Sequence, residues 1–251
     1  MSEVLASANE TAATQYRTMA KIVADYLRSA ILSGRLGPGD RIQQDEVARQ
    51  LGVSRMPVRD ALRVIQSEGL VEIHPHRAAV VVSLRPKDIV EIFEIRAILE
   101  GRAAELAAPQ ITDAILAHLR ETYATMDGIL KDWNHDRWLG LNREFHTTIY
   151  AASGWTRLCG IIENLLNTLF PYQRAASGLA TRRLTAHREH QQILLAAEKR
   201  DSALLGQLTA EHLRATARDL VGYVSTHRGE FSDASPRPEG SDRVSGTVDH
   251  T

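Results

Sequence analysis

Apolar residues recur at helical spacing in three segments near the start of the chain. Residues 16–32 carry them three and four positions apart, which predicts a helix that the Gly- and Pro-rich residues 33–40 end. A short helix is predicted over residues 44–51, with Gly52 as its stop. A third is expected from its N-cap Ser54 to about residue 68, with Gly69 after it.

Alternation of apolar and polar residues follows the third helix and predicts a small β-hairpin. Residues 70–74 and 78–82 form its strands, and Pro75-His76-Arg77 forms its turn. Arg85-Pro86 then interrupts the pattern, so we expect a linker over residues 84–87.

From residue 88 to residue 228 only helical spacing is found. Apolar positions from Ile89 to Leu106 predict one long helix, and further helices are predicted over residues 112–133, 137–152, 156–176, 182–199 and 202–227. Pro171 is expected to kink or split the helix over residues 156–176. The fold class is therefore mainly α, with an N-terminal domain over residues 16–83 and an all-helical domain over residues 88–228. Residues 1–15 are expected to form a flexible arm, and residues 229–251 a disordered tail.

Charge and cysteine content narrow the class of protein. Lys and Arg number 30 against 31 Asp and Glu, a formal net charge of −1, which excludes nucleic-acid binding through bulk charge but allows a local basic face. The single cysteine, Cys159, excludes a disulfide framework and a Cys-rich zinc module. We find no apolar span of membrane length and no signal-peptide pattern, so a cytoplasmic protein without membrane contact is expected.

Three helices followed by a hairpin is the order of a winged helix-turn-helix, whose recognition helix enters the DNA major groove. Arg55, Arg59 and Arg63 lie four residues apart on the third helix and share one stripe. The guanidinium fork suits guanine or phosphate, although such a stripe is also typical of a solvated helix face. Candidates for phosphate contacts are Arg41, Arg49, His74, His76 and Arg77.

Three segments of this domain carry a long motif: ILSGRLGPGDRI at residues 31–42, VSRMPVRDAL at 53–62 and EGLV at 68–71. The motif closely resembles the GntR family of bacterial transcription regulators. The resemblance implies that Arg55 and Arg59 are the main DNA contacts. The expected DNA-binding set is Arg41, Arg49, Ser54, Arg55, Pro57, Arg59, Arg63 and Arg77. The wing departs from the family pattern, because Ala78 follows Arg77 where the family usually has glycine.

The helical domain resembles the ligand-binding and dimerisation domain of the FadR subfamily, the FCD-type domain, and its six predicted helices resemble the VanR-like form. The matching pieces are EIR at residues 94–96, LE at 99–100, Asn142 with FH at 145–146, EH at 189–190 and EHL at 211–213.

Histidines on three of the predicted helices are candidate metal ligands. Asn142 and His146 lie one turn apart on one helix, and His190 and His212 lie on two later helices. Spacing alone favours ordinary core or surface histidines, whereas the family resemblance favours a metal site formed by these four residues. Three imidazoles and an amide oxygen suit a divalent transition metal, zinc first, with nickel or manganese as alternatives.

An effector site is expected beside the metal. Arg96 lies on an otherwise apolar helix face, where it needs either an internal salt bridge, for example to Glu100, or the carboxylate of an effector. Tyr172 and Arg174 are further candidates for this pocket, and His187 is a candidate ligand or effector contact.

The function predicted from these features is a ligand-responsive transcription regulator, a repressor, that binds a palindromic operator in double-stranded DNA as a homodimer. A small organic or sugar acid is the expected effector. The alternative is a metal-dependent enzyme in the helical bundle with an attached DNA-binding module.

Overall fold

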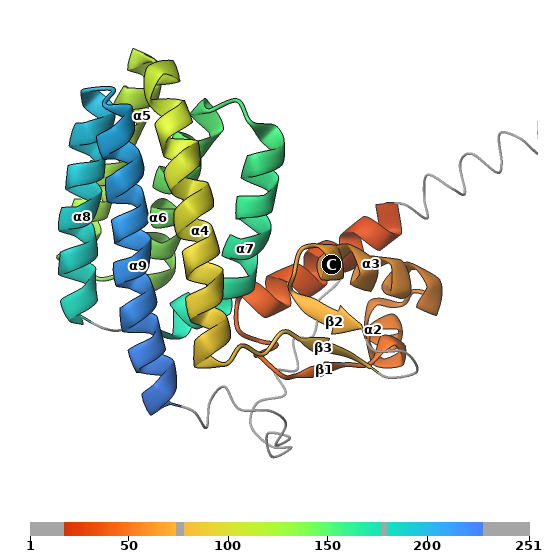
Figure 1. Cartoon of the computed structure of the whole chain (residues 1–251). Helices are drawn as coiled ribbons and strands as arrows, with labels where there is room; N and C mark the ends of the chain where they lie inside the picture. The colour runs from red at the N-terminus through yellow and green to blue at the C-terminus, as the bar shows by residue number, and fades with distance from the viewer. Residues whose placement is uncertain (1–17, 74–77, 177–179, 228–251) are drawn as a thin grey trace, which may run out of the picture.

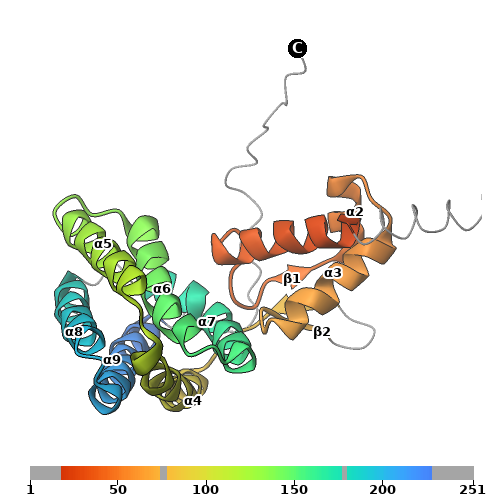
Figure 2. The same ribbon diagram turned by 90° about the horizontal axis from the view of Figure 1, so that it is seen from above.

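The structure, a computed structural model, describes residues 18–73, 78–176 and 180–227. The chain forms a small N-terminal body with helices and a sheet, and a larger bundle of helices beside it (Figures 1 and 2). The predicted arm and tail lie outside the described residues, as do the turn of the predicted hairpin and residues 177–179, between the helices predicted over residues 156–176 and 182–199. Within the described part of the chain, no helix combines the length and apolarity needed to cross a membrane.

The N-terminal body contains the predicted helices and one strand more than the predicted hairpin. Its helices are residues 18–32, α2 (Gln44–Leu51) and α3 (Arg55–Ser67). The sheet has the antiparallel order β1-β3-β2, formed by β1 (Arg41–Ile42), β2 (Val71–Ile73) and β3 (Ala79–Val81). The sequence did not indicate β1, because two residues are too few for an alternating pattern.

The apolar stripe of α3 fixes its orientation. Val58, Ala61, Leu62 and Ile65 are fully buried in the core that the N-terminal body forms. The opposite side of α3 must therefore face solvent. Gly69 follows the helix with φ +74°, a left-handed conformation that glycine adopts without strain.

The bundle has the six predicted helices, with shifted ends. They are α4 (Pro86–Ala107), α5 (Asp113–Ile129), α6 (His135–Ala152), α7 (Thr156–Ala176), α8 (Ala180–Glu198) and α9 (Ser202–Thr226), with a short 3₁₀ turn at Ala108–Gln110.

One proline expectation needs correction, and one of the two alternatives given for another is excluded. Residues 84–87 do not all form a linker, because α4 already begins at Pro86, where proline's missing N–H costs no hydrogen bond, and Arg85 and Asp88 cap it. Pro171 lies inside α7 and does not split it into two helices.

Helices α4 and α9 run side by side and approach closely at two glycines (Figure 1). A Cβ atom on Gly101 would lie 3.1 Å from the carbonyl oxygen of Gly206. A Cβ atom on Gly206 would lie 2.9 Å from the carbonyl oxygen of Gly101 and would overlap Cγ of Glu105. The two backbones therefore pack at a distance that only glycine allows at these positions.

Helix α7 joins the bundle to the N-terminal body. The hydroxyl of Thr168 donates to the carbonyl of Gly69 at 3.1 Å, and the backbone N–H of Leu84 donates to the hydroxyl of Tyr172 at 2.5 Å. Arg174 contacts the carbonyl of Ser33. One helix thus holds the end of α3, the linker and the end of the first helix.

We expect Gly206→Ala to lower the free energy of unfolding by about 1–3 kcal/mol, because a rigid backbone carbonyl must shift to admit the methyl group. Gly160→Ala on α7 is the matched control, since nothing lies within 4 Å of its Cβ position. Alanine there should be neutral or stabilise by up to about 1 kcal/mol. Urea unfolding of both variants measures the difference, and equal stabilities would contradict the close packing.

Candidate functional site

The arginine stripe of α3 lies on the solvent-exposed side of the helix. Arg55, Arg59 and Arg63 are all exposed, as the burial of the opposite face requires. Arg55 pairs with Asp45, and Nη1 of Arg63 lies 3.6 Å from Oδ1 of Asp60. Such exposed ion pairs are weak, so a DNA phosphate can replace them at small cost.

The other predicted DNA contacts divide into three groups. Arg41, Arg49 and Ser54 are exposed, and Ser54 is the N-cap residue of α3 without a side-chain capping hydrogen bond. Pro57 is buried, so its ring shapes the first turn of α3 and is not presented to DNA. Arg77 lies outside the described residues.

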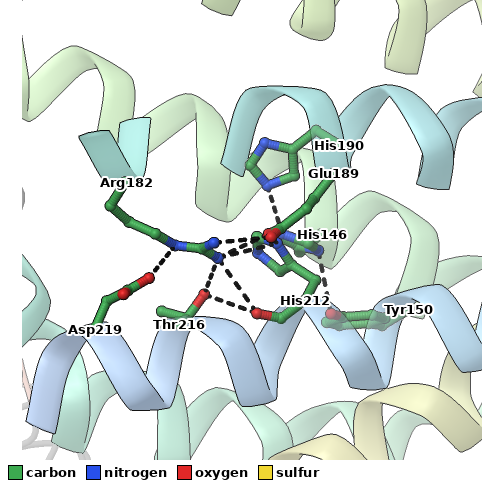
Figure 3. Close-up of polar contacts among 8 residues, drawn as sticks. All are labelled: His146, Tyr150, Arg182, Glu189, His190, His212, Thr216 and Asp219. Atoms are coloured by element: carbon green, nitrogen blue, oxygen red, sulfur yellow. Dashed lines mark hydrogen bonds and ion pairs between the residues drawn. The ribbon is translucent and has the colours of Figure 1, made fainter. Parts of the chain in front are cut away.

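Three predicted metal ligands converge in the interior of the bundle. His146 comes from α6, His190 from α8 and His212 from α9, and each offers a ring nitrogen within 4.8 Å of the others' (Figure 3). All three are buried, and Nε2 of His146 lies 3.0 Å from Nε2 of His190. The packing of three helices therefore brings together residues that lie far apart in the sequence.

Hydrogen bonds orient two of the three rings. Nδ1 of His212 lies 2.7 Å from Oε2 of Glu189, and Nδ1 of His146 lies 3.3 Å from the hydroxyl of Tyr150. Tyr150 donates its own proton to Glu100 at 2.6 Å, so His146 must be the donor to Tyr150. Both rings then carry the proton on Nδ1 and leave Nε2 with a lone pair, the arrangement typical of metal-bound histidine.

The three imidazoles of the cluster are held in their neutral form. Burial lowers the pKa of His146 and His190 well below the usual value, and the charge of His212 acts in the same direction. Burial also lowers the pKa of His212, although its hydrogen bond to Glu189 opposes this. The imidazoles are thus neutral near pH 7, which is the state that binds metal.

A cavity opens beside the cluster. Its volume is about 90 Å³, several times the ~10–15 Å³ that one water molecule needs on the same measure. Its wall includes Arg96, Asn142, His146, Arg182 and His212, with Leu166, Phe170 and Gln173 from α7. Asn142 is half-buried one turn before His146, and its role as a fourth ligand stays a prediction.

Arg96 forms the predicted internal salt bridge and keeps one nitrogen for the other predicted partner, an effector carboxylate. Its side chain is 3% exposed, and Nε donates to Oε1 of Glu100 at 2.5 Å, so the internal salt bridge is present. Its Nη1 is also buried and has no hydrogen-bond partner among the described residues. An unpaired buried N–H of a cation is costly, so this nitrogen would be stabilised by an acceptor that can reach it.

Three predicted effector contacts lie elsewhere. The ring of His187 stacks on Tyr123 at 4.4 Å between centroids, and its Nε2 lies 3.1 Å from Oδ1 of Asp127. Tyr172 and Arg174 make the contacts of α7 with the linker and N-terminal body, and Arg174 also pairs with Asp136 at 2.9 Å. None of the three is among the residues that line the cavity.

Sequence reasoning named Glu100 as a possible salt-bridge partner of Arg96 but missed three other supporting residues. Tyr150 lies one turn from a predicted site residue, at i+4 from His146, and this spacing was a usable signal. Glu189 adjoins His190, yet it supports His212. Arg182 lies seven residues before Glu189, and no local pattern marks it.

Comparison with known proteins identifies both domains. Residues 19–81 match the profile of bacterial regulatory proteins of the gntR family, and residues 91–215 match the FCD domain. A transcriptional regulator of the TAR-I ttuE-ttuC' intergenic region of Agrobacterium vitis is 33% identical over 149 residues, covering 57% of this chain and 87% of the relative.

Two further relatives are named as a transcriptional regulator and a transcriptional repressor, and the structure of the first has been solved. McbR of Escherichia coli is 31% identical over 178 residues, covering 70% of this chain and 80% of McbR. The solved McbR/YncC structure aligns with TM-score 0.71 and 26% identity over 82% of this chain and 98% of that one. The gluconate operon transcriptional repressor of Bacillus licheniformis is 28% identical over 151 residues, 57% of this chain and 62% of the repressor.

The chain belongs to the GntR family of bacterial regulatory proteins and carries an FCD domain. It is therefore a DNA-binding transcriptional regulator. The family and these relatives are transcriptional regulators, so the enzyme alternative drawn from the sequence is not supported.

Proposed function

We propose that this regulator binds a palindromic operator as a homodimer and responds to a small organic or sugar acid held by a metal ion and Arg96. The observation that carries the proposal is a cavity lined by His146, His212 and Arg96, beside the three-histidine cluster, together with a buried Nη1 of Arg96 that lacks a hydrogen-bond partner among the described residues. A metal and a guanidinium are the two groups that best bind a carboxylate.

The DNA part of the proposal rests on α3. Its exposed face carries Arg55, Arg59 and Arg63, and the exposed Ser54 is the N-cap residue of this predicted recognition helix. One winged module makes few contacts, and a dimer doubles them while matching the two-fold symmetry of a palindrome.

The metal part rests on the fit of the donor set. His146, His190 and His212 would hold a divalent transition ion, zinc first, with Asn142 as a neutral fourth ligand. The ion would supply a Lewis-acidic position for one oxygen of the effector. Glu100 and Glu189 are both held by arginines, so neither is available as a general base, and binding rather than turnover is the expected role.

The repressor sense of the proposal follows from the relative named as a gluconate operon repressor. Binding of the acid would favour a dimer conformation in which the two copies of α3 no longer match the half-sites. A tenfold loss of operator affinity needs a preference of about 1.4 kcal/mol between the two conformations.

For DNA binding, Arg55→Ala and Arg59→Ala should each weaken operator affinity by about 1–3 kcal/mol if these side chains contact base edges. Arg102→Ala is the control, because Arg102 is exposed on α4 in the bundle and pairs with Glu105. Fluorescence anisotropy with the bound promoter fragment measures the effect. Unchanged affinity in the Arg55→Ala/Arg59→Ala double variant would remove α3 as the recognition helix.

For metal binding, the purified protein should contain a divalent ion that is lost in His146→Ala and His190→Ala but kept in His118→Ala, an exposed histidine on α5. Mass spectrometry of the metal content measures this. Because burial lowers the pKa of the ligands, the ion should remain bound somewhat below pH 6.5, the ordinary imidazole pKa, and leave at more acidic pH. Equal metal content in all variants would reject the site.

For effector binding, gluconate, lactate and citrate serve as probes in thermal unfolding. An acid that occupies the cavity should raise the unfolding temperature of the wild type. It should bind Arg96→Lys at least tenfold more weakly, and so stabilise that variant less, since lysine keeps the charge opposite Glu100 but lacks Nη1. Titration of the acid against the operator complex then tests regulation. Equal stabilisation of both proteins would exclude Arg96 from the effector site.

A further inference from the structure

Arg182 is a partly buried cation of the cavity wall that neither the sequence motifs nor the proposed ligand set accounts for. It lies near the start of α8 with its side chain 14% exposed, and its guanidinium spans two turns to reach Glu189. Nη1 donates to Oε1 of Glu189 at 2.9 Å, and Nη2 donates to Oε2 at 2.8 Å. Arg182 therefore holds both oxygens of this carboxylate (Figure 3).

The same guanidinium also binds α9. Nη2 donates to the hydroxyl of Thr216 at 2.6 Å and lies 3.4 Å from the carbonyl oxygen of His212, while Nε lies 3.3 Å from Oδ2 of Asp219. All three guanidinium nitrogens are thus engaged within the protein. Arg182 differs in this respect from Arg96, whose Nη1 has no hydrogen-bond partner among the described residues.

The carboxylate that Arg182 holds is the one that orients His212. Oε2 of Glu189 lies 2.7 Å from Nδ1 of His212, whereas Nη2 of Arg182 lies 3.5 Å from the same nitrogen. The shorter contact decides the proton position, because a carboxylate can only accept. Nδ1 of His212 then carries the proton, and Nε2 keeps its lone pair for the cluster.

Support of this kind is unequal among the three histidines. Nδ1 of His146 has only the neutral hydroxyl of Tyr150, at 3.3 Å, and Nδ1 of His190 has no hydrogen-bond partner among the described residues. His212 is the one of the three with a direct charged partner in the described structure. Without Arg182, the half-buried Glu189 would be free to turn toward water and would no longer fix the ring.

We propose that Arg182 is a positioning residue of the metal centre, which holds Glu189 so that His212 presents Nε2 to the metal. The inference rests on the proposed metal site and deepens it. Arginine is required, because its planar fork contacts two carboxylate oxygens and Thr216 together, whereas a lysine ammonium is a single point charge.

The sign of the effect separates positioning from simple electrostatics. Removing a positive charge near a bound cation would by itself tighten metal binding. Loss of the positioning contact instead weakens it, and substitutions that disturb the outer contacts of metal-bound histidines typically lower metal affinity about 10–100-fold.

The test measures Zn²⁺ and Co²⁺ affinity of the full chain by competition with a chromophoric chelator. Arg182→Ala is expected to bind about 10–100-fold more weakly than the wild type and to change the visible d–d bands of bound Co²⁺. Arg182→Lys should also lose affinity. Arg188→Ala, which removes an equal charge from an exposed position on α8, should bind as the wild type does.

A double substitution tests the route through Glu189. In a Glu189→Ala background, Arg182→Ala should cause no further loss of metal affinity, because there is no carboxylate left to hold. Thermal unfolding of the metal-free variants verifies that each is folded.

Wild-type or tighter metal affinity in Arg182→Ala would overturn the inference and leave the metal centre intact, as would additive losses in the double variant. Absence of metal binding by the wild type would overturn the proposed centre, and this inference with it.

Discussion

Three imidazoles buried in mutual contact must remain neutral, and the bundle is arranged around this constraint. In the part of the chain that the structure describes, the cluster of His146, His190 and His212 contains no carboxylate, and the charged groups lie one contact further out. Glu100 reaches the cluster through Tyr150, and Glu189 reaches it through its bond to His212. Each carboxylate forms an ion pair with an arginine: Glu100 with Arg96, and Glu189 with Arg182.

This arrangement sets the charge of the site. The two carboxylates are already balanced by the two arginines, so a divalent ion among the imidazoles would bring a positive charge that the supporting groups do not cancel. Asp219 offsets part of it at the cavity wall. With such an ion bound, an anionic ligand would complement the cavity better than a neutral sugar would.

The close approach of α4 and α9 is what brings the supporting groups within reach. Arg96 and Glu100 precede Gly101 on α4, and His212 and Thr216 follow Gly206 on α9. Larger residues at the two glycines would separate these helices and draw the groups of α4 away from those of α9. The geometry of the polar centre therefore depends on the close packing of the bundle.

Much of the fold follows from the sequence, because helical periodicity is a local property. The position of the α3 arginines could be predicted since their apolar neighbours fix which face is buried, and the Arg96–Glu100 pair since i and i+4 positions meet on any helix. The gathering of the histidines depends on how three helices pack, and only the family resemblance indicated it. For the same reason the sequence could not indicate that Tyr172 contacts Leu84, because it does not show which side of α7 faces the cavity.

The two sides of α7 have separate tasks. Leu166, Phe170 and Gln173 share the side that lines the cavity, while Thr168 and Tyr172 contact the N-terminal body and the linker from another side. Side chains that shape the cavity can therefore vary during evolution without altering those that join the two bodies. A gene duplicate of this protein can acquire a new chemical signal through a few substitutions on one side of a single helix, and inherit its connection to DNA unchanged.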